Sequence, residues 1–457
     1  MKLKQFVALF AIGFLISLSP VIIRAALGIP GIIGFPTYYH QRIAGYILSG
    51  DFSWYDPLSF GGRPYTYPPF FSFMLAGFAV PFGLELGGFV MMGILGGAVA
   101  VLCFAIAKDL IGKKKAFLVF LLSSPTFIYL FSHLSTRSPP IVLGLLAIYL
   151  VLKKKPWWWV SIPLAFSLVF HPETGLIFSF LSLIADKKYL KNLRFVGLAL
   201  LFSGFFYVPF YLAYGIPQQN ALHADYAARN YGLESFNLPF FAWETSFKDG
   251  NPTYDNLALG VIILSFFGLW KSGNSFLRKW FLISLLLALI STRLLMYLVF
   301  PAAMLAALGA YQLSHMSKKY SKLLLLAFLA YSLVIGSLAA FSFGTSWPTK
   351  SQTEALLWIK GNTPENGTII SDWSHGHWIT GIAYRRSFVD GYAEYAPDAD
   401  QRMAELKEFY RTCKVPEGYD IQYAYLEDWF IRQQNMTCLD RFQKVYDKDY
   451  IYVFRLV

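Results

Sequence analysis

The chain has 457 residues, of which 56% are hydrophobic and only 14% are charged. Because a soluble domain averages about 25% charged residues, this composition excludes an ordinary soluble protein and predicts one that crosses a membrane several times. The formal net charge of +12 would suit nucleic-acid binding, but the lysines and arginines stand in short clusters between apolar runs, as in cytoplasmic loops.

Apolar runs follow one another from the N-terminus to about residue 343. A membrane span needs about 20 apolar residues, and we expect about eleven spans, with boundaries loose by a few residues. The first run resembles a signal peptide, but it is long and lacks a clear small-residue cleavage site, so we expect a retained helix. The expected spans are 5–26, 89–111, 116–132, 140–152, 157–171, 174–186, 195–214, 255–270, 280–294, 296–314 and 323–343.

The basic clusters between the spans predict the orientation of the chain. With the N-terminus in the cytoplasm, every strong cluster, such as Lys113–Lys115, falls on the cytoplasmic side, and the C-terminal part lies outside the plasma membrane. This orientation requires that residues 68–87 do not span. If they formed an ordinary membrane helix, all later clusters would lie outside, so we expect a helix in the outer interface, where aromatic residues and prolines are tolerated.

The composition changes near residue 345. We therefore predict a transmembrane domain over 1–345, with a large first external loop over 27–88, and an extracytoplasmic α/β domain over 346–457. Within that domain we expect a helix over 351–360 and a strand over 368–370.

Three features of this C-terminal part depend on its location. Cys413 and Cys438 could form a disulfide if the part is extracytoplasmic, whereas Cys103 lies in an apolar run. Tripeptides that begin at Asn366 and Asn435 fit N-glycosylation acceptors, which is weak support for an outside location because such tripeptides arise often by chance.

The first external loop is rich in side chains that bind sugars, phosphates and metals. Carboxylates beside aromatic rings suit carbohydrates and hard cations, although Asp56-Pro is also an ordinary turn former, and Arg63 could clamp a phosphate or close a turn. The residues of this kind are Tyr38, Tyr39, His40, Arg42, Asp51, Trp54, Asp56, Arg63, Tyr65 and Tyr67.

Ionisable residues near the spans are the other candidates, because charges at membrane depth are costly. Arg293 could bind a lipid phosphate or snorkel at a helix end. Glu173, beside His171, could ligate a metal, polarise a hydroxyl or belong to an ordinary turn. Glu244 is a lone carboxylate in an aromatic loop.

Five segments resemble, in order, motifs of the GT-C membrane glycosyltransferases, and most of all those of the archaeal oligosaccharyltransferase catalytic subunit. The first is the Asp-Pro…Gly-Gly-Arg-Pro-Tyr-x-Tyr-Pro-Pro pattern of the first loop. The others are Ser135–Ser138, Phe241–Glu244, Thr292–Met296, in which the family's arginine holds a lipid phosphate, and Asp372–Gly376.

The chain also departs from the family pattern. The family's catalytic Asp falls at positions 36–37, and no acidic residue precedes Asp51. The second acidic motif is absent, because Arg137 is followed by Ser-Pro-Pro. In the outer motif only Trp373 and Gly376 match, so recognition of an acceptor peptide does not carry over.

The resemblance implies a transferase that moves a sugar or oligosaccharide from a polyprenyl-phosphate or -diphosphate carrier to an extracytoplasmic protein, lipid or glycan. Nucleic acid is not expected as a partner, and Mn²⁺ or Mg²⁺ is an optional cofactor. The first alternative is an inactive homologue that binds or presents a lipid-linked glycan. A transporter is a weaker one, because it predicts mid-membrane charges that the spans mostly lack.

Each candidate residue takes an expected role under this reading. The expected catalytic residues are Asp56, His40 and Glu173. Residues expected to bind the donor lipid are Arg293, Arg63, Arg137, Arg42, Tyr65 and Trp54. Those expected to contact the acceptor are Glu244, Trp373 and His375, and Glu244 and Asp56 are the expected metal ligands.

Overall fold

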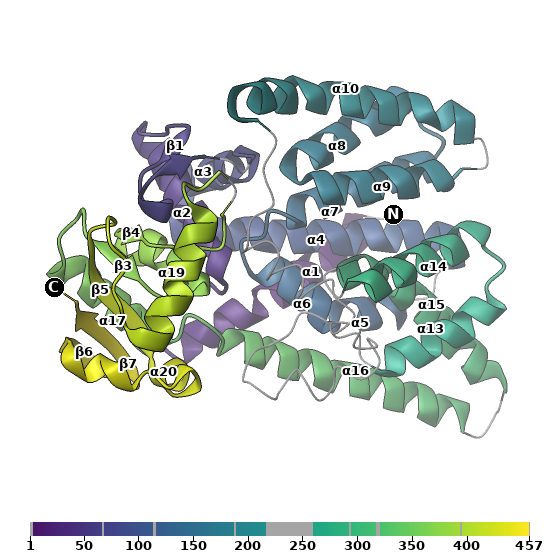
Figure 1. The fold of residues 1–457 in the computed structure, drawn as a ribbon. Coiled ribbons are helices and arrows are strands. Elements are labelled where there is room, and N and C mark those ends of the chain that lie inside the picture. The colour runs from purple at the N-terminus through teal and green to yellow at the C-terminus, as the bar shows by residue number, and fades with distance from the viewer. Residues whose placement is uncertain are drawn as a thin grey trace. The chain divides into compact units, whose positions relative to one another are not determined.

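The computed structural model describes residues 3–65, 68–112, 116–186, 189–215, 259–291, 294–316, 320–393 and 395–456. The chain forms two compact units, each built from segments that are distant in the sequence (Figure 1). The first unit comprises residues 1–26, 88–209 and 228–346, and the second comprises residues 27–87, 210–227 and 347–457.

The first unit is helical, and its helices follow the predicted spans in order. The predicted span 116–132 is divided into two helices, because Pro125 follows Ser123 and Ser124 at a break. The helices are α1 (Leu3–Ala26), α4 (Leu84–Ile111), α5 (Ala116–Leu122), α6 (Pro125–Ser132), α7 (Ser138–Leu152), α8 (Trp157–Phe170), α9 (Pro172–Ile184), α10 (Tyr189–Tyr214), α13 (Leu259–Lys271), α14 (Ser275–Ile290), α15 (Leu295–Met316) and α16 (Ser321–Gly344).

Within the described residues, five helices are long and apolar enough to cross a membrane, namely α1, α4, α10, α15 and α16. The other apolar helices of this unit are shorter than the length of about 20 residues that a straight span needs. The protein is therefore an integral membrane protein, as predicted, while the total of about eleven spans remains a prediction.

Helices α7, α8 and α9 pack against one another (Figure 1). A Cβ atom at Gly175 of α9 would lie 2.6 Å from the Cα of Leu168 in α8, so only glycine permits this close approach. The hydroxyl of Ser167 in α8 donates to the carbonyl of Pro140 in α7, at 3.1 Å. These contacts bring the start of α9 close to the start of α7, where the candidate site lies.

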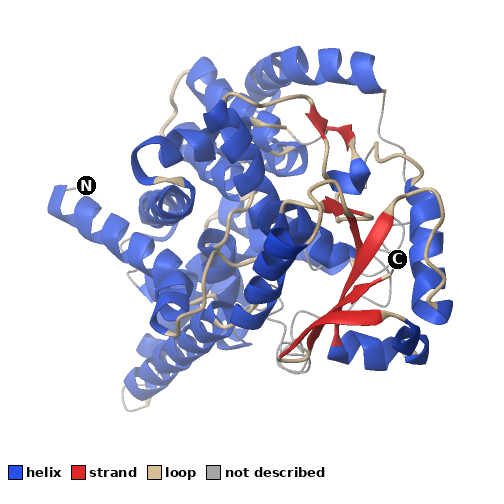
Figure 2. Ribbon diagram, turned by 90° about the vertical axis from the view of Figure 1, so that its left-hand side faces the viewer, coloured by secondary structure: helices blue, strands red, loops and turns tan. Residues whose placement is uncertain are grey.

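The second unit contains a five-stranded sheet in the order β4-β3-β5-β7-β6, drawn in red in Figure 2. Strand β3 is parallel to β4 and β5, and the other pairs are antiparallel. The predicted small α/β domain is therefore present. The strands are β3 (Thr368–Ile370), β4 (Arg386–Ser387), β5 (Ile421–Glu427), β6 (Gln443–Lys448) and β7 (Ile451–Arg455).

Helices cover both faces of this sheet, because its central strands alternate between two cores. On one face Tyr425 packs with residues of α17 (Lys350–Asn362), such as Leu356. On the other face Leu426 packs with residues of α19 (Ala399–Thr412), such as Leu406. The helix expected over 351–360 and the strand expected over 368–370 are both confirmed.

The predicted first external loop belongs to this same unit. Its elements are α2 (Phe35–Ser49), the short strands β1 (Tyr55–Asp56) and β2 (Arg63–Pro64), a 3-10 turn at Ser59–Gly61 and α3 (Phe70–Phe82). Phe60 is fully buried in the core that α19 covers, and the amide of Ser387 donates to the carbonyl of Leu58, at 2.9 Å. The compact units thus group the predicted loop 27–88 with the predicted outer domain, from opposite ends of the chain.

Helix α3 occupies most of the segment that we expected in the membrane interface. Its 13 residues are about 20 Å long, which is less than the hydrocarbon thickness of about 30 Å. One face, with Phe71 and Leu75, is buried, and Phe73, Val80 and Phe82 are exposed. An interfacial position fits this length and pattern, and it remains a prediction.

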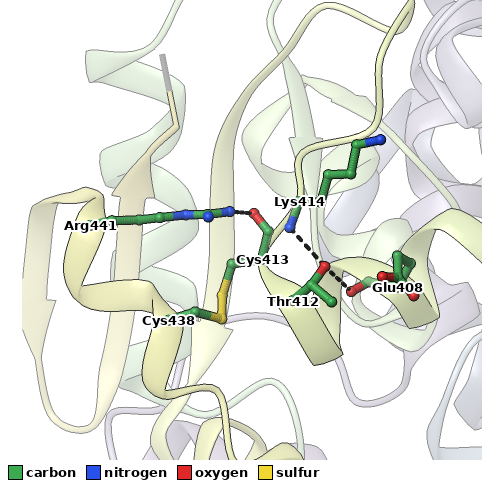
Figure 3. Close-up of a disulfide and its surroundings, with 6 residues drawn as sticks. All are labelled: Glu408, Thr412, Cys413, Lys414, Cys438 and Arg441. Carbon is green, nitrogen blue, oxygen red and sulfur yellow. Dashed lines mark hydrogen bonds between the residues drawn. A yellow bond between two sulfur atoms is a disulfide. The ribbon is translucent and has the colours of Figure 1, made fainter.

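The predicted pairing of Cys413 with Cys438 is confirmed (Figure 3). The disulfide ties the end of α19 to a 3-10 turn at Thr437–Arg441, and Arg441 donates to the carbonyl of Cys413. Closing a loop over a sequence separation of 25 residues stabilises the folded state by about 3.5 kcal/mol in the chain-entropy model.

Candidate functional site

In the first unit, Arg137, His171 and Glu173 come together at the starts of two helices. Arg137 immediately precedes α7, and His171 is the single residue between α8 and α9. Pro172 occupies the first turn of α9, where the absence of an amide hydrogen costs nothing, and Glu173 follows it. The sequence therefore places a carboxylate in the first turn of a helix, where the helix dipole favours negative charge.

The side chains of this cluster contact one another directly. Arg137 donates from Nε to His171 Nε2 and from Nη2 to Glu173 Oε2, both at 3.3 Å. The side chains of Arg137 and Glu173 are 20% and 37% exposed, so the ion pair can be reached from solvent or lipid headgroups. Glu173 Oε1 is buried and has no hydrogen-bond partner within the described residues.

A chain of hydrogen bonds extends from His171 into the helical core. Thr174 Oγ1 lies 3.1 Å from His171 Nδ1 and 2.8 Å from the hydroxyl of Tyr297, which is fully buried in α15. Arg137 can only donate, so Nε2 of a neutral ring must accept, and we assign the ring proton to Nδ1, facing Thr174 Oγ1. The Thr174 amide nitrogen also lies 3.3 Å from Nδ1, but a hydrogen bond from this amide would require the tautomer in which Nδ1 is unprotonated.

This arrangement can bind a ligand that carries both an anion and a hydrogen-bond donor. A partly exposed guanidinium is suited to phosphate oxygens. The unpartnered Glu173 Oε1 beside it can accept a hydrogen bond or a proton from a hydroxyl or amide group. Because Arg137 Nε donates to the ring of His171, the guanidinium is oriented before a ligand arrives.

In the second unit, the predicted catalytic residue Asp56 is sealed inside a buried ion pair. Arg42 donates from Nη1 to Asp56 Oδ1 and from Nη2 to Oδ2, each at 2.7 Å, and both side chains are fully buried. The amides of Leu58 and Ser59 also donate to Oδ1, at 3.1 and 3.3 Å. The carboxylate of Asp56 is thus occupied, which favours a structural role over that of a base or metal ligand.

The electrostatics agree with this geometry. Burial by itself raises the pKa of Asp56, but the charge and hydrogen bonds of Arg42, with smaller contributions from Arg63 and the Leu58 amide, lower the pKa to about 2. A base with so low a pKa is almost fully ionised yet a weak proton acceptor at neutral pH.

A second buried chain joins the loop to the C-terminal segment of this unit. Arg63 Nε donates to Ser59 Oγ at 2.6 Å, and the Ser59 hydroxyl donates to Asp390 Oδ2 at 2.5 Å. Asp390 Oδ1 accepts from the amide of Tyr392, at 2.9 Å. All three side chains of the Arg63–Ser59–Asp390 chain are buried, so Arg63 connects two parts of a core.

The remaining loop candidates are divided between the core and the surface. His40 is buried, with Nε2 at 3.3 Å from the hydroxyl of Tyr392. Tyr65 is buried, and its ring centroid lies 6.1 Å from that of Tyr39. Trp54, in contrast, is 44% exposed and could stack on a sugar. Helix α2 covers positions 36–37, and the hydroxyl of Thr37 donates to the carbonyl of Ile33.

The predicted acceptor residues of the outer motif also lie largely inside the second unit. His375 is buried, stacks on Trp378 with centroids 4.7 Å apart, and has Nε2 at 3.4 Å from Glu427 Oε1. Trp373 is partly buried against the core beneath α19. Trp373 is therefore better placed than His375 to meet a bound acceptor.

Acid should weaken this unit in two stages. In the unfolded chain, Asp56 would return to its ordinary pKa of 3.8, so its contribution is present above that value and is lost as the pH falls toward about 2. Burial lowers the pKa of His377 below 6.5, so the neutral ring must be protonated on unfolding, and its contribution is lost as the pH falls below 6.5.

We expect unfolding midpoints in denaturant, followed by near-ultraviolet circular dichroism, to decrease from pH 7 to 5 through His377 and further below pH 4. His377→Gln should remove the first decrease and leave the second. A midpoint that is constant from pH 7 to pH 3 would contradict the burial of both groups.

The described residues do not fit a divalent cation. Asp56, one of the two predicted ligands, has both oxygens bound by Arg42, and Glu244, the other, lies outside the described residues. No group of three or more His, Cys, Asp or Glu side chains within the described part of the chain could hold a metal ion.

Arg293 also lies outside the described residues. Sequence reasoning placed Glu173 beside His171 and singled out Arg137 in another segment, but it gave no role to Thr174 or Tyr297, which complete the cluster. A signal for Thr174 was available, since it follows His171 by one helical turn. Tyr297 stands in an apolar helix, where one aromatic residue among many gives no such signal.

Comparisons with known proteins identify the fold. No protein-family model matches the chain. Over 197 residues it is 29% identical to dolichyl-phosphooligosaccharide-protein glycotransferase 1 of Pyrococcus furiosus, and the match covers 40% of this chain. It spans only 19% of the length of that relative.

Three solved structures resemble the chain along almost its whole length. The oligosaccharyltransferase of Archaeoglobus fulgidus, in complex with Zn and sulfate, has a TM-score of 0.63 at 15% identity, covering 92% of this chain and 68% of that one. ArnT from Cupriavidus metallidurans, bound to undecaprenyl phosphate, has a TM-score of 0.61 at 11% identity and coverages of 99% and 98%. The arabinofuranosyltransferase AftD from Mycobacteria has a TM-score of 0.55 at 13% identity, covering 100% of this chain and 42% of that one.

The fold is therefore that of the GT-C membrane glycosyltransferases, as the sequence predicted. As the sequence resemblance predicted, the chain is similar in sequence to an archaeal dolichyl-phosphooligosaccharide-protein glycotransferase over the matched segment, and its fold is similar to that of an archaeal oligosaccharyltransferase.

Proposed function

We propose that the protein transfers a sugar or oligosaccharide from a polyprenyl-phosphate or -diphosphate carrier to an extracytoplasmic acceptor. The observation that carries this proposal is the Arg137–His171–Glu173 cluster, which contains a partly exposed ion pair at the starts of two apolar helices. The fold supports it, since ArnT with the same fold binds undecaprenyl phosphate, and another structure of the Archaeoglobus enzyme holds dolichol-phosphate and an inhibitory peptide.

In the proposed reaction, Arg137 binds the phosphate of the donor lipid. As the bond between the sugar C1 and the phosphate oxygen breaks, negative charge grows on that oxygen, and the guanidinium stabilises it. His171 is a positioning residue, because it holds Arg137 through Nε2. Arg293 is a second candidate for the phosphate, on the family resemblance.

Glu173 is the proposed general base. Its Oε1 atom has no partner within the described residues and can take the proton from the acceptor hydroxyl or amide as the new bond to C1 forms. We prefer it to Asp56 and His40, since Asp56 is saturated by Arg42, and His40 is only 1% exposed whereas the side chain of Glu173 is 37% exposed. Asp56 and Arg63 are proposed to hold the first loop against the rest of its unit. Trp54, Trp373 and Glu244 remain candidates for acceptor or sugar contacts.

The direct test is release of the carrier by purified protein in lipid nanodiscs that contain lipid-linked sugars from the source membrane. We expect free polyprenyl phosphate or diphosphate, and a sugar on the acceptor, in a reaction that Arg137→Ala abolishes. The assay is run with Mn²⁺, with Mg²⁺ and with a chelator. If the carrier is released neither with Mn²⁺, nor with Mg²⁺, nor with the chelator, the proposal that the protein is a transferase is wrong.

A second function fits one observation. Because Asp56 is occupied by Arg42, the chain could have kept the lipid-phosphate site and lost the chemistry, and would then bind or present a lipid-linked glycan. Binding of the lipid that requires Arg137, without release under any condition, would support this function over transfer.

We propose that the N-terminus is cytoplasmic and the second unit is extracytoplasmic at the plasma membrane. The disulfide supports this, because such bonds persist in oxidising compartments. We expect Asn366→Cys, in an exposed turn, to react with a membrane-impermeant maleimide in intact cells, and Lys154→Cys, after α7, to react only after lysis. The reverse pattern would overturn the orientation.

A further inference from the structure

We propose that Asn435 carries an N-linked glycan, in preference to Asn366, the other Asn-x-Thr tripeptide of the second unit. The proposal goes beyond the function above, and it rests on the extracytoplasmic placement proposed for this unit. Both asparagines are exposed, so a glycan at either position would extend into solvent. What distinguishes them is the threonine and the backbone around it.

At Asn435 the whole acceptor tripeptide lies in a local turn. Asn435 ends α20 (Asp428–Gln434) with a positive φ of 52°, and Thr437 is exposed. The backbone hydrogen bonds at Asn435 and Met436 are local, because their amides donate to the carbonyls of Arg432 and Ile431. Only Met436 is buried, so the tripeptide can become extended by releasing one side chain and a single turn.

At Asn366 the threonine belongs to the centre of the sheet. Thr368 is buried and is the first residue of β3, where it pairs with Arg386 of β4 and with Ile421 of β5. Exposing this threonine to an enzyme would require β3 to separate from both of its neighbours, β4 and β5. In the folded protein, the tripeptide at Asn366 is therefore closed, although its asparagine is exposed.

The disulfide limits how far the Asn435 segment opens. Cys438 directly follows Thr437 and is tied to Cys413, so opening ends immediately after the tripeptide and the C-terminal strands stay paired (Figure 3). A modifying enzyme would thus meet an exposed turn on the surface of a folded domain, and surface loops are where acceptor tripeptides of secreted proteins lie.

The modification is a balanced group transfer from a lipid-linked oligosaccharide. A bond forms between Asn435 Nδ2 and C1 of the first sugar, and the bond from C1 to the phosphate oxygen breaks. The electron pair of that bond leaves with the polyprenyl phosphate or diphosphate. One amide proton passes to a base of the N-glycosylating enzyme in the same membrane.

The test is mass spectrometry of peptides from the full-length protein purified from its source cells. We expect sugar-sized mass additions on the Asn435 peptide, with higher occupancy than on the Asn366 peptide. Thr437→Ala should abolish the addition at Asn435, and Thr437→Ser should keep it. Asn362→Gln is the matched control, because Asn362 is exposed but begins no acceptor tripeptide.

Three results would overturn the proposal, two of them on the modification itself and one on the orientation. The first is an unmodified Asn435 in protein whose Asn366→Cys variant reacts with impermeant maleimide in intact cells, because the orientation would then be right and the modification absent. The second is equal or higher occupancy at Asn366, since buried Thr368 would then not be the deciding factor. If the maleimide fails to react in intact cells, the orientation is wrong and this proposal fails with it, whereas carrier release is measured separately.

Discussion

Glu173→Gln is expected to reduce sugar transfer by about 10²–10⁴-fold, the usual contribution of a general base. Glutamine has nearly the same shape and can still accept from Arg137, so the starts of α7 and α9 should stay together. It cannot take a proton at neutral pH. The turnover number should therefore decrease while the affinity for the donor lipid changes little, and single-turnover measurements separate the two quantities.

The matched control for this substitution is Glu85→Gln. Glu85 is also the acidic residue in the first turn of an apolar helix, α4, and it is exposed. Its replacement should leave turnover unchanged. Equal losses in both variants would mean that the removal of a carboxylate disturbs the membrane unit in general, and Glu173 would lose its role as base.

Arg42→Ala is expected to destabilise the second unit by about 3–5 kcal/mol, the cost of leaving a buried charge without its partner. The substitution removes both hydrogen bonds to Asp56 and strands a fully buried carboxylate. The loss should appear as faster hydrogen exchange of the α2 and sheet amides, whereas amides of the helical unit keep their protection.

Two further variants identify the cause of this loss. Arg42→Met combined with Asp56→Leu removes both charges, so it should recover much of the stability. Arg432→Ala breaks a surface ion pair, in which Arg432 is 74% and Asp428 is 20% exposed, and should cost at most about 1 kcal/mol. A loss as large in Arg432→Ala as in Arg42→Ala would show that burial does not decide the energy of these pairs.

The helices and the outer sheet could be predicted because their signals are local. A membrane span can be recognised from its own run of apolar residues. The start of α17 carries a capping box between Thr349 and Gln352, which is also a local signal. The disulfide was predicted on the condition that the polar segment shared by Cys413 and Cys438 is extracytoplasmic. None of these features depends on which distant residues come together.

The environment of the first loop could not be predicted for the opposite reason. In the sequence, the residue types of Arg42, Asp56 and Arg63 suggest ligand binding. Only their hydrogen-bond partners in the structure indicate that they have a structural role. One such partner, Asp390, lies 331 residues from Ser59 along the chain. The same types of polar residue join distant segments in a core and bind phosphates. A single sequence therefore does not tell which of the two roles such a residue has.

The cluster in the helical unit shows the intermediate case. Arg137 and Glu173 were visible as charged residues beside apolar runs, but their pairing depends on the close approach of α8 and α9 at Gly175. The hydroxyls of Thr174 and Tyr297 join them only in three dimensions, 123 positions apart.

The most direct test of the central claim is equilibrium binding of a polyprenyl phosphate to the protein in nanodiscs, with Arg137→Ala beside Lys153→Ala. Lys153 is the matched cation, because it caps the opposite end of α7 and pairs with Asp109 at the surface. A lost charge-assisted hydrogen bond is worth about 1.5–3 kcal/mol, so Arg137→Ala should weaken binding by about 10- to 100-fold while Lys153→Ala binds like the unmodified protein. Unchanged binding in Arg137→Ala, or equal weakening in both variants, would contradict a lipid-phosphate site at the starts of α7 and α9.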